Sequence, residues 1–499
     1  MKSELVKTAV VGGWTLALAA GCSSIPSVGP DYAHPDWEIP EMKLPDAGQP
    51  TTNLTATCEY EPAKGGADGR VAITKGVMDA WWTRFNDPVL NRLVGSGITN
   101  NVAYLRAVTR LEQADWELLG SYAAFRPRFA GAGNWGRSWY HKSTSSAGGR
   151  RTHYNAQSVA LDGQWELDIF GGNRRLSEAA FAEAEAAGWT VDDAWLSLTT
   201  QIGIQYVNLR TTQERIEVAR TNLVLQSETY DILKSRLDSG IGDELAVNQC
   251  AYVVERTRAS IPTLLAEEEA LKNALAILAG EMPGSLDEEL KPVAVRRDWL
   301  LAPQKVGELK LDLLRARPDV RAAERRLAAA TARIGVAKSQ WFPKLFINGT
   351  VGWEAKQHHR FFSTDSFFAT LGPSVSWPIF QGGAIYANVK ATEAQMNAAA
   401  LDYEESVLNA YREVRDAYSA YTQEYHRYQA LASAVRAATD AVAISKDLYK
   451  NGLKDFNNVI DAQRSRLEYE EQFVLSSGLI TTDLIALYRA LGGGLETDR

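Results

Sequence analysis

The sequence predicts a mainly α-helical chain that also supplies strands to a membrane β-barrel. Three observations lead to this fold class. The two halves of the chain repeat one another, two very long spans favour helix, and one strand alternates between apolar and polar side chains. The composition of the 499 residues, 45% apolar and 23% charged, is that of an ordered protein.

The repeat is collinear along the chain. Its corresponding segments are Leu105-Arg106-Ala107 with Val320-Arg321-Ala322, Arg126-Pro127-Arg128 with Phe342-Pro343-Lys344, Asp168-Ile169-Phe170-Gly171 with Pro378-Ile379-Phe380-Gln381, and Gly240 and Val247 with Gly452 and Val459. The last three are separated by 216, 210 and 212 residues, far more than the roughly 20–50 of a solenoid. We therefore expect a fused duplication, with repeat I at 86–300 and repeat II at 301–499.

The N-terminus indicates export. Residues 8–20 form an apolar stretch of 13 residues, too short for a membrane span of roughly 20. The following Ala-Gly-Cys22 is typical of a bacterial lipoprotein signal, although Leu18 stands one place early, and Ser23 favours delivery to the outer membrane. The prediction is a signal peptide at 1–21 and a lipidated, extended segment at 22–85. A secretory signal with an incidental cysteine is the alternative.

Next comes an apolar anchor. Trp81-Trp82 and Phe85 precede Asp87-Pro88, which reads as a helix start with proline in the first turn. The long helices are expected at Asn173–Asp238 and Ala384–Lys450, where good helix formers dominate apart from two glycines. A helix of this length measures about 100 Å, so it must pack alongside others in a coiled coil or cylinder.

The clearest strand is Ala156–Phe170. Its apolar parity includes Val159, Leu161, Trp165, Leu167 and Ile169, and its polar parity gives a candidate lumen row of Asp162, Gln164, Glu166 and Asp168. This pattern suits a barrel wall between lipid and water, and tryptophans flank the strand segments as interfacial aromatics do. A surface strand of a soluble sandwich is the alternative.

Two strands in each repeat make four, too few to close a barrel. Bacterial barrels begin at eight strands, and an open sheet in lipid leaves costly unpaired backbone groups. The sheet must be shared between chains. Three copies would give twelve strands with approximate six-fold symmetry, and a dimer with eight strands is the alternative.

The order and spacing of several motifs resemble the TolC-like outer-membrane factors, and more narrowly their NodT lipoprotein branch. The resemblance covers the mature chain and rests on Val28-Gly29-Pro30-Asp31-Tyr32, Trp81-Trp82 with Phe85-Asn86-Asp87-Pro88, Arg317-Pro318-Asp319-Val320-Arg321-Ala322-Ala323-Glu324, Gly335-Val336-Ala337, Trp377-Pro378-Ile379-Phe380 and Val459-Ile460-Asp461-Ala462-Gln463-Arg464.

The resemblance implies a trimeric channel-tunnel, in which a twelve-stranded outer-membrane barrel continues into a periplasmic α-helical cylinder. Such proteins are passive, gated exit ducts of tripartite efflux pumps, for drugs and other small molecules, or of type I secretion systems. They work with a periplasmic adaptor and an inner-membrane transporter, here of the resistance-nodulation-division type. The implied location is the outer membrane, with a lipid anchor at Cys22 and a large periplasmic part.

Two sets of site residues follow from the resemblance. Gly240 and Gly452 match the hairpin tips where adaptors dock, and Asp461 with Arg464 matches the closed aperture. Asn457 and Asn458 belong to the same region, in place of an apolar plug and a second acid. In repeat I, Gln249 stands where repeat II has Asp461, so the gate should be three-fold only. A solvated Asp461 paired with Arg464 or Arg466 is the alternative.

Other functions are disfavoured. A net charge of −8 argues against a nucleic-acid partner. The six histidines form no zinc-protease motif, no P-loop or Rossmann fingerprint is present, and we expect neither catalysis nor a cofactor. His358-His359 is a weak metal candidate because adjacent strand residues point apart. Cys58 and Cys250 could pair in the periplasm, although two unpaired thiols are favoured. A structural or adhesive lipoprotein with a helical stalk is the competing function.

Overall fold

The computed structural model describes residues 27–35, 53–55, 80–140, 152–292, 305–306, 315–355, 361–451, 453–493 and 496–497. The predictions for Cys22, Cys58, His358, His359 and Gly452 lie outside these residues. The chain divides into two compact units. The first comprises the described parts of Met1–Asp36, Leu111–Ala187 and Ala323–Tyr403, and the second those of Trp37–Arg110, Gly188–Ala322 and Glu404–Arg499.

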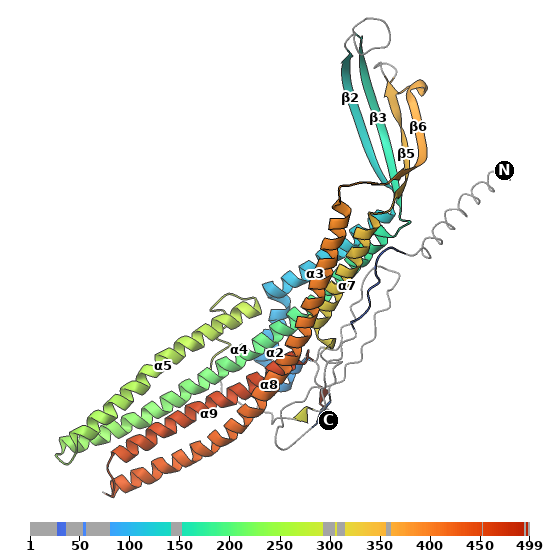
Figure 1. Ribbon diagram of the computed structural model, residues 1–499. Coiled ribbons are helices and arrows are strands. Elements are labelled where there is room, and N and C mark those ends of the chain that lie inside the picture. The colour runs from blue at the N-terminus through green and yellow to red at the C-terminus, as the bar shows by residue number, and fades with distance from the viewer. Residues whose placement is uncertain are drawn as a thin grey trace, which may run out of the picture. The chain divides into compact units, whose positions relative to one another are not determined.

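The elements occur in nearly the same order in the two halves of the chain (Figure 1). The first half holds α2 (Pro88–Asn100), α3 (Val102–Tyr122), β2 (Arg128–Tyr140), β3 (Thr152–Leu167), α4 (Gly172–Asp238) and α5 (Glu244–Ala279). The second half holds α7 (Pro318–Ser339), β5 (Lys344–Ala355), β6 (Phe367–Ser376), α8 (Ala384–Lys450) and α9 (Asn457–Ala490). Short 3₁₀ turns lie at Trp81–Phe85 (η2), Ala123–Phe125 (η3) and Thr364–Ser366 (η6).

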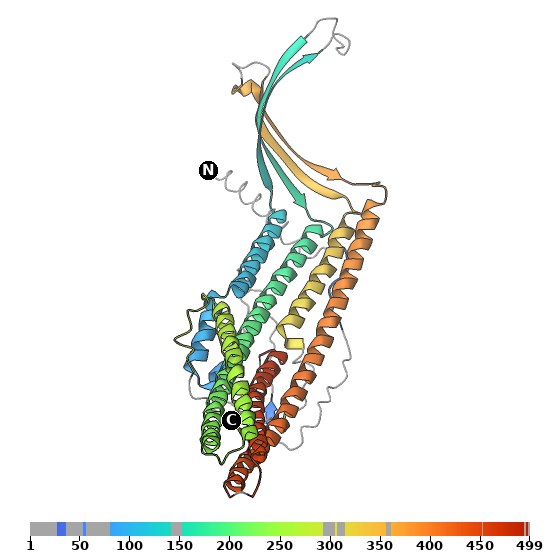
Figure 2. The ribbon, with the colours of Figure 1, turned by 90° about the vertical axis from the view of Figure 1, so that its left-hand side faces the viewer.

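The first unit contains one antiparallel sheet in the order β2-β3-β5-β6, which curves as Figure 2 shows. Strand β3 was expected at 156–170, but it begins four residues earlier and ends at Leu167. The second unit contains a small sheet in the order β4-β1-β7, formed by β4 (Lys305–Val306), β1 (Asn53–Thr55) and β7 (Glu496–Thr497). Its strands pair in parallel between β1 and β4 and antiparallel between β1 and β7.

The strand registers refine the repeat alignment. Arg128 lies opposite Gln164 in the first hairpin, and Lys344 lies opposite Ser376 in the second. These pairs correspond when β2 is matched to β5 at a separation of 216 and β3 to β6 at 212. The separation of 210 taken from the Ile-Phe segments therefore does not describe the strands. Gly171 and Gly383, with φ of 78° and 88°, also correspond at 212.

The two predicted long helices are confirmed. Helices α4 and α8 each span 67 residues and differ from the expected ranges by one residue at most. Neither Gly188 nor Gly203 interrupts α4. A Cβ at Gly203 would lie 2.4 Å from the Trp81 ring, so this glycine makes room for a buried aromatic side chain.

The predicted anchor and helix start are also confirmed. Trp81 is 1% exposed, and it stacks on Tyr488 with ring centroids 6.0 Å apart. Helix α2 begins at Pro88, and the Asp87 carboxylate caps it by accepting hydrogen bonds from the backbone N–H groups of Val89 and Leu90.

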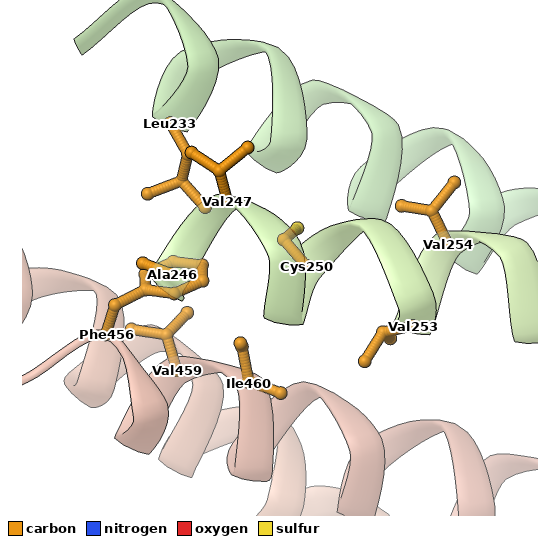
Figure 3. Packing of buried hydrophobic residues seen from close by; sticks show 9 residues of the cluster. All are labelled: Leu233, Ala246, Val247, Cys250, Val253, Val254, Phe456, Val459 and Ile460. Carbon is orange, nitrogen blue, oxygen red and sulfur yellow. The ribbon is translucent and has the colours of Figure 1, made fainter. Parts of the chain in front are cut away.

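A buried apolar cluster joins three helices near the ends of the hairpins (Figure 3). Its members are Leu233 from α4, then Ala246, Val247, Cys250, Val253 and Val254 from α5, and Phe456, Val459 and Ile460 at the start of α9. Val247 and Val459, which correspond in the repeat, therefore share one core. Helix α9 is apolar enough in composition to cross a bilayer, but 61% of its most apolar stretch is buried inside the chain. We therefore assign it to the helical core.

Within the first unit, the N-terminal segment 27–35 is held by several close contacts. The backbone N–H of Val28 donates to Phe170 O at 3.1 Å, and the Arg175 guanidinium donates to Val28 O and Gly29 O. Gly29, with φ of 106°, packs so closely on Gly335 that a Cβ would lie 2.5 Å from Gly335 Cα. The glycine of the Val-Gly-Pro-Asp-Tyr motif is thus required by a backbone crossing.

Candidate functional site: the sheet faces and the hairpin tips

One face of the sheet is apolar on all four strands. Directly paired residues share a face, so the register assembles this set: Phe129 on β2, then Val159, Leu161, Trp165 and Leu167 on β3, Leu345, Ile347, Val351 and Trp353 on β5, and Phe367, Ala369, Leu371, Pro373 and Val375 on β6. From Leu345 to Trp353 the face runs about 27 Å along the strand, or about 21 Å after a 40° tilt. That is close to the ~25 Å apolar band of an outer-membrane barrel.

Tryptophans mark both ends of this face. Trp135 is 81% exposed and lies toward the loop end, as does Trp353. Toward the helical end, the Trp165 indole donates to Phe125 O at 2.9 Å, and the Trp377 indole donates to Trp341 O at 3.0 Å. An apolar ring with a fixed polar tip suits the boundary between lipid and water.

The opposite face is polar and internally bonded. Asp162 accepts a hydrogen bond from the Thr350 hydroxyl at 2.7 Å, and Glu166 pairs with Lys344 at 3.0 Å. Gln164 lies opposite Arg128 on one side and Asn348 on the other. The structure thus brings together Asp162, Gln164 and Glu166, as the sequence predicts.

Asp168 departs from the predicted row. Strand β3 ends at Leu167, and the Asp168 carboxylate accepts hydrogen bonds from the backbone N–H groups of Asn173 (3.1 Å) and Arg174 (2.9 Å). It also pairs with the Arg174 guanidinium at 3.4 Å. The alternation of apolar and polar residues therefore predicts too long a strand. The Asp168 carboxylate lies near the start of α4, where the free N–H groups of the first turn are stronger partners than water in the lumen.

The two edges of the sheet are open. Strands β2 and β6 each pair with one neighbour, and within the described residues neither has a partner on its other side. Both strands also carry large apolar side chains that are exposed to solvent: Leu371 on β6 is 83% exposed, and Trp135 on β2 is exposed to a similar extent. Open edges with apolar side chains invite pairing with another chain.

The predicted aperture residues share one face of α9. Asn457, Asp461 and Arg464 are exposed at the start of this helix, with Asn458 beside them, while Val459 and Ile460 are buried on the other side. Within the described chain, no ion pair joins Asp461 to Arg464 or Arg466, and Arg466 instead bonds Glu470 at 2.7 Å. Asp461 is thus exposed to solvent, but the ion pair with Arg464 or Arg466 that the alternative assumed is not formed among the residues that the structure describes.

The first hairpin tip has the predicted left-handed glycine. Gly240 has φ of 73°, its N–H donates to Leu237 O, and the N–H of Ile241 donates to Arg236 O. These two bonds form a Schellman end to α4. Asp243 caps α5 by accepting a hydrogen bond from Leu245 N at 3.0 Å.

Three further tip residues escaped the sequence reading. A Cβ at Gly242 would lie 2.4 Å from Leu237 N, so this glycine is required as well. Ile241 is 71% exposed, and Leu453, its counterpart in the repeat, is 68% exposed. The signal that could have identified Ile241 and Leu453 is their shared position, an aliphatic residue directly after each predicted tip glycine.

The Arg-Pro-Asp motif anchors the base of α7. The buried Arg317 guanidinium contacts Asp319 at 2.8 Å, Glu413 at 2.6 Å and the backbone carbonyl of Ala490 at 2.8 Å. Nearby, burial raises the pKa of Asp193, with a further contribution from the charge of Asp319. The motif thus ties α7, α8 and the end of α9 together within the second unit.

Comparisons with known proteins agree on one family. The model described as outer membrane efflux protein matches residues 98–281 and again residues 311–493. Nodulation protein T of Rhizobium leguminosarum bv. trifolii is 30% identical over 451 residues, which cover 90% of this chain and 89% of that protein. The toluene efflux pump outer membrane protein TtgF of Pseudomonas putida is 28% identical over 487 residues, 96% of this chain and 95% of that protein.

The fold comparison gives the same result. The solved structure of the outer-membrane channel OprN matches with a TM-score of 0.81 and 30% identity, covering 94% of this chain and 99% of that chain. The fold class predicted from the sequence, a helical tunnel carrying a share of a barrel, is confirmed by this match.

Proposed function

We propose that this chain, which belongs to the outer membrane efflux protein family, is the outer-membrane exit duct of a tripartite efflux system. The observation that supports this best is the sheet, with one apolar face, one polar face and two open edges. The duct is a passive, gated conduit for small molecules, and the face with Asp162, Gln164 and Glu166 lines its outer-membrane lumen.

The active assembly is a homotrimer. Each copy supplies four strands, so three copies give a closed barrel of twelve, which leaves no backbone group unpaired in lipid. The two matches of the family model, one in each half, support the proposal that 86–300 and 301–499 are two copies of one unit.

A lipid on Cys22 anchors the assembly in the outer membrane. Cys22 precedes Ser27 by five residues, which span at most about 17 Å of extended chain. Val28 is held at Phe170, three residues past the end of β3. The anchor would therefore lie near the helical end of the sheet, which also carries Trp165 and Trp377. Labelled palmitate should enter the wild-type chain but not the Cys22→Ser variant.

The exposed face at the start of α9 forms the periplasmic gate. In a trimer, three copies of Asp461 would form an acidic ring, with Arg464 one turn further and Asn457 and Asn458 ahead of it. Replacing Asp461 with Ala should raise conductance or antibiotic leakage. An unchanged channel would remove this residue from the gate.

The hairpin tips dock the periplasmic adaptor, and through it an inner-membrane transporter of the resistance-nodulation-division type. Gly240 shapes the first tip, and Gly452 is its counterpart in the sequence of the second. Ile241 and Leu453 supply apolar contacts that are otherwise exposed to water. Replacing Ile241 and Leu453 with Ser should weaken adaptor capture about ten-fold or more, while Leu475→Ser, at an exposed leucine away from the tips, should not.

Conductance in planar lipid bilayers tests the function as a whole. Purified trimers should give small, gated currents that rise when Asp461 is replaced. Trimers of verified size that never conduct would instead favour the structural lipoprotein, because an adhesive stalk needs no lumen.

A further inference from the structure

The sheet already contains the kind of junction that would close a barrel. Strands β3 and β5 come from different halves of the chain and pair antiparallel, with Gln164 opposite Asn348 and Trp165 opposite Ile347. Strand β6 corresponds to β3, and β2 corresponds to β5, in the matching registers described above. The internal junction therefore serves as a template for a junction between two copies.

We propose that β6 pairs antiparallel with β2 of a neighbouring copy, with Ser376 opposite Ala132 and Val375 opposite Gly133. This assignment rests on the proposed trimeric duct and adds the register that joins its subunits. The register is obtained from the β3–β5 pairs. Adding 212 to the β3 residue number gives the residue on β6, and subtracting 216 from the β5 residue number gives the residue on β2, so the pair Gln164–Asn348 becomes Ser376–Ala132.

The faces of the two edge strands agree with this register. Val375 and Gly133 both lie on the apolar face, and Ser374 would meet Asn134 on the polar face. A shift by one residue would place Val375 in the polar lumen. Chain direction also agrees, because β2 begins and β6 ends next to helices, so the helices of both copies stay on the same side of the membrane.

The same register places the bulky Trp377 side chain opposite a glycine, Gly131. Trp377, 58% exposed, would lie opposite Gly131, and a Cβ at Gly131 has no neighbour within 4 Å in the single chain. Within the chain, Phe129 already covers Gly163 in this manner, since a Cβ at Gly163 would lie 2.9 Å from its ring. An aromatic ring placed over a cross-strand glycine is a recurring device of β-sheets.

Cysteine cross-linking in outer membranes tests the register. In a Cys58→Ser, Cys250→Ala background that retains Cys22, the pair Ala132→Cys and Ser376→Cys should oxidise to covalent trimers. The matched pair Ala132→Cys and Ser374→Cys lies on the same face but follows the separation of 210. It should cross-link about ten-fold less, because diagonal neighbours are ~7–8 Å apart and a disulfide needs Cβ atoms near 3.8 Å.

A stronger product from the Ser374 pair would overturn the proposed register, and a lack of product from both pairs in verified trimers would overturn the junction. Covalent dimers as the end product would support eight strands and overturn the trimer. Conductance of the same preparations distinguishes a failure of the proposed register from a failure of the proposed duct function. Conducting trimers with the wrong cross-links refute only the register, and correct cross-links without current refute only the duct.

A second variant tests the fit at Gly131. Gly131→Val should leave the secondary structure of the chain unchanged, because its side chain meets open space, but lower the yield of heat-resistant trimers several-fold. Trp377→Ala in the same chain should restore part of that yield. Full trimer yield with Gly131→Val would show that Trp377 does not lie over this position.

Discussion

The Tyr206 hydroxyl donates a 2.8 Å hydrogen bond to Asp87 Oδ2, while Oδ1 of the same carboxylate caps helix α2. One side chain thus fixes the start of α2 against the middle of α4. The Arg210 guanidinium donates to the same hydroxyl at 3.0 Å and extends this arrangement.

Asp87→Ala should destabilise the chain by about 2 kcal/mol, because it removes a helix cap and a part-buried hydrogen bond together. Thermal unfolding of the detergent-solubilised protein, followed by circular dichroism, measures the loss. Asp243→Ala is the matched control, since that exposed residue only caps α5 and should cost about 1 kcal/mol or less. Equal losses in both variants would contradict a special role for the Tyr206 contact.

Gly203→Ala should destabilise the second unit by about 1–3 kcal/mol, because the added methyl group would collide with the Trp81 ring. Gly95→Ala in α2 is the control. A Cβ at Gly95 meets nothing within 4 Å, so this change should stabilise its helix by about 0.5–1 kcal/mol. The melting temperatures of the two variants should move in opposite directions, and a neutral Gly203→Ala would show that Trp81 can shift at no cost.

Burial, with a smaller contribution from Glu424, raises the pKa of Asp483 to about 6. The folded state therefore holds this proton more tightly than the unfolded chain. Stability from this group is fully present below about pH 4 and is lost as the pH rises toward 6. Asp483→Asn should be the more stable protein at pH 7, by about 1 kcal/mol after solvent screening, and equal to wild type near pH 4. A wild-type advantage at pH 7 would refute this.

Burial raises the pKa of the Cys250 thiol to about 11. In a Cys58→Ser chain, maleimide at pH 8 should modify Cys250 on the order of a hundred-fold more slowly than an ordinary thiol. The reaction should become fast only when denaturant separates α4, α5 and α9. Ile241→Cys in a chain that also carries Cys250→Ala is the exposed control. Rapid labelling of native Cys250 would show that the cluster opens under native conditions.

Local patterns predicted the two long helices to within one residue at each end, but they misplaced both ends of strand β3. The helix formers of α4 and α8 and the parity of β3 depend on neighbours in sequence, so these elements followed from composition and alternation. The role of Asp168 depends on where the chain leaves the strand for α4. Backbone N–H groups, which carry no sequence signal, decide that point.

The strand register and the close backbone contact at Gly242 could not be predicted from the sequence for a related reason. The Ile-Phe segments gave a separation of 210, whereas hydrogen-bonded pairing sets 212 in the strands. Gly242 was not among the predicted tip residues, although the backbone of Leu237 occupies the space that its side chain would need. Such contacts arise only when the turn is closed in three dimensions.

The cluster of Val247, Val459 and their neighbours has a mechanical consequence. It packs the start of α9, which carries Asp461, against the α4–α5 hairpin. In the proposed duct, an adaptor bound at Ile241 would hold one end of this packed cluster. Its binding energy would then be passed to the proposed Asp461 ring as a tilt of three packed helices, and that energy would limit how far the balance between the closed and open states can shift.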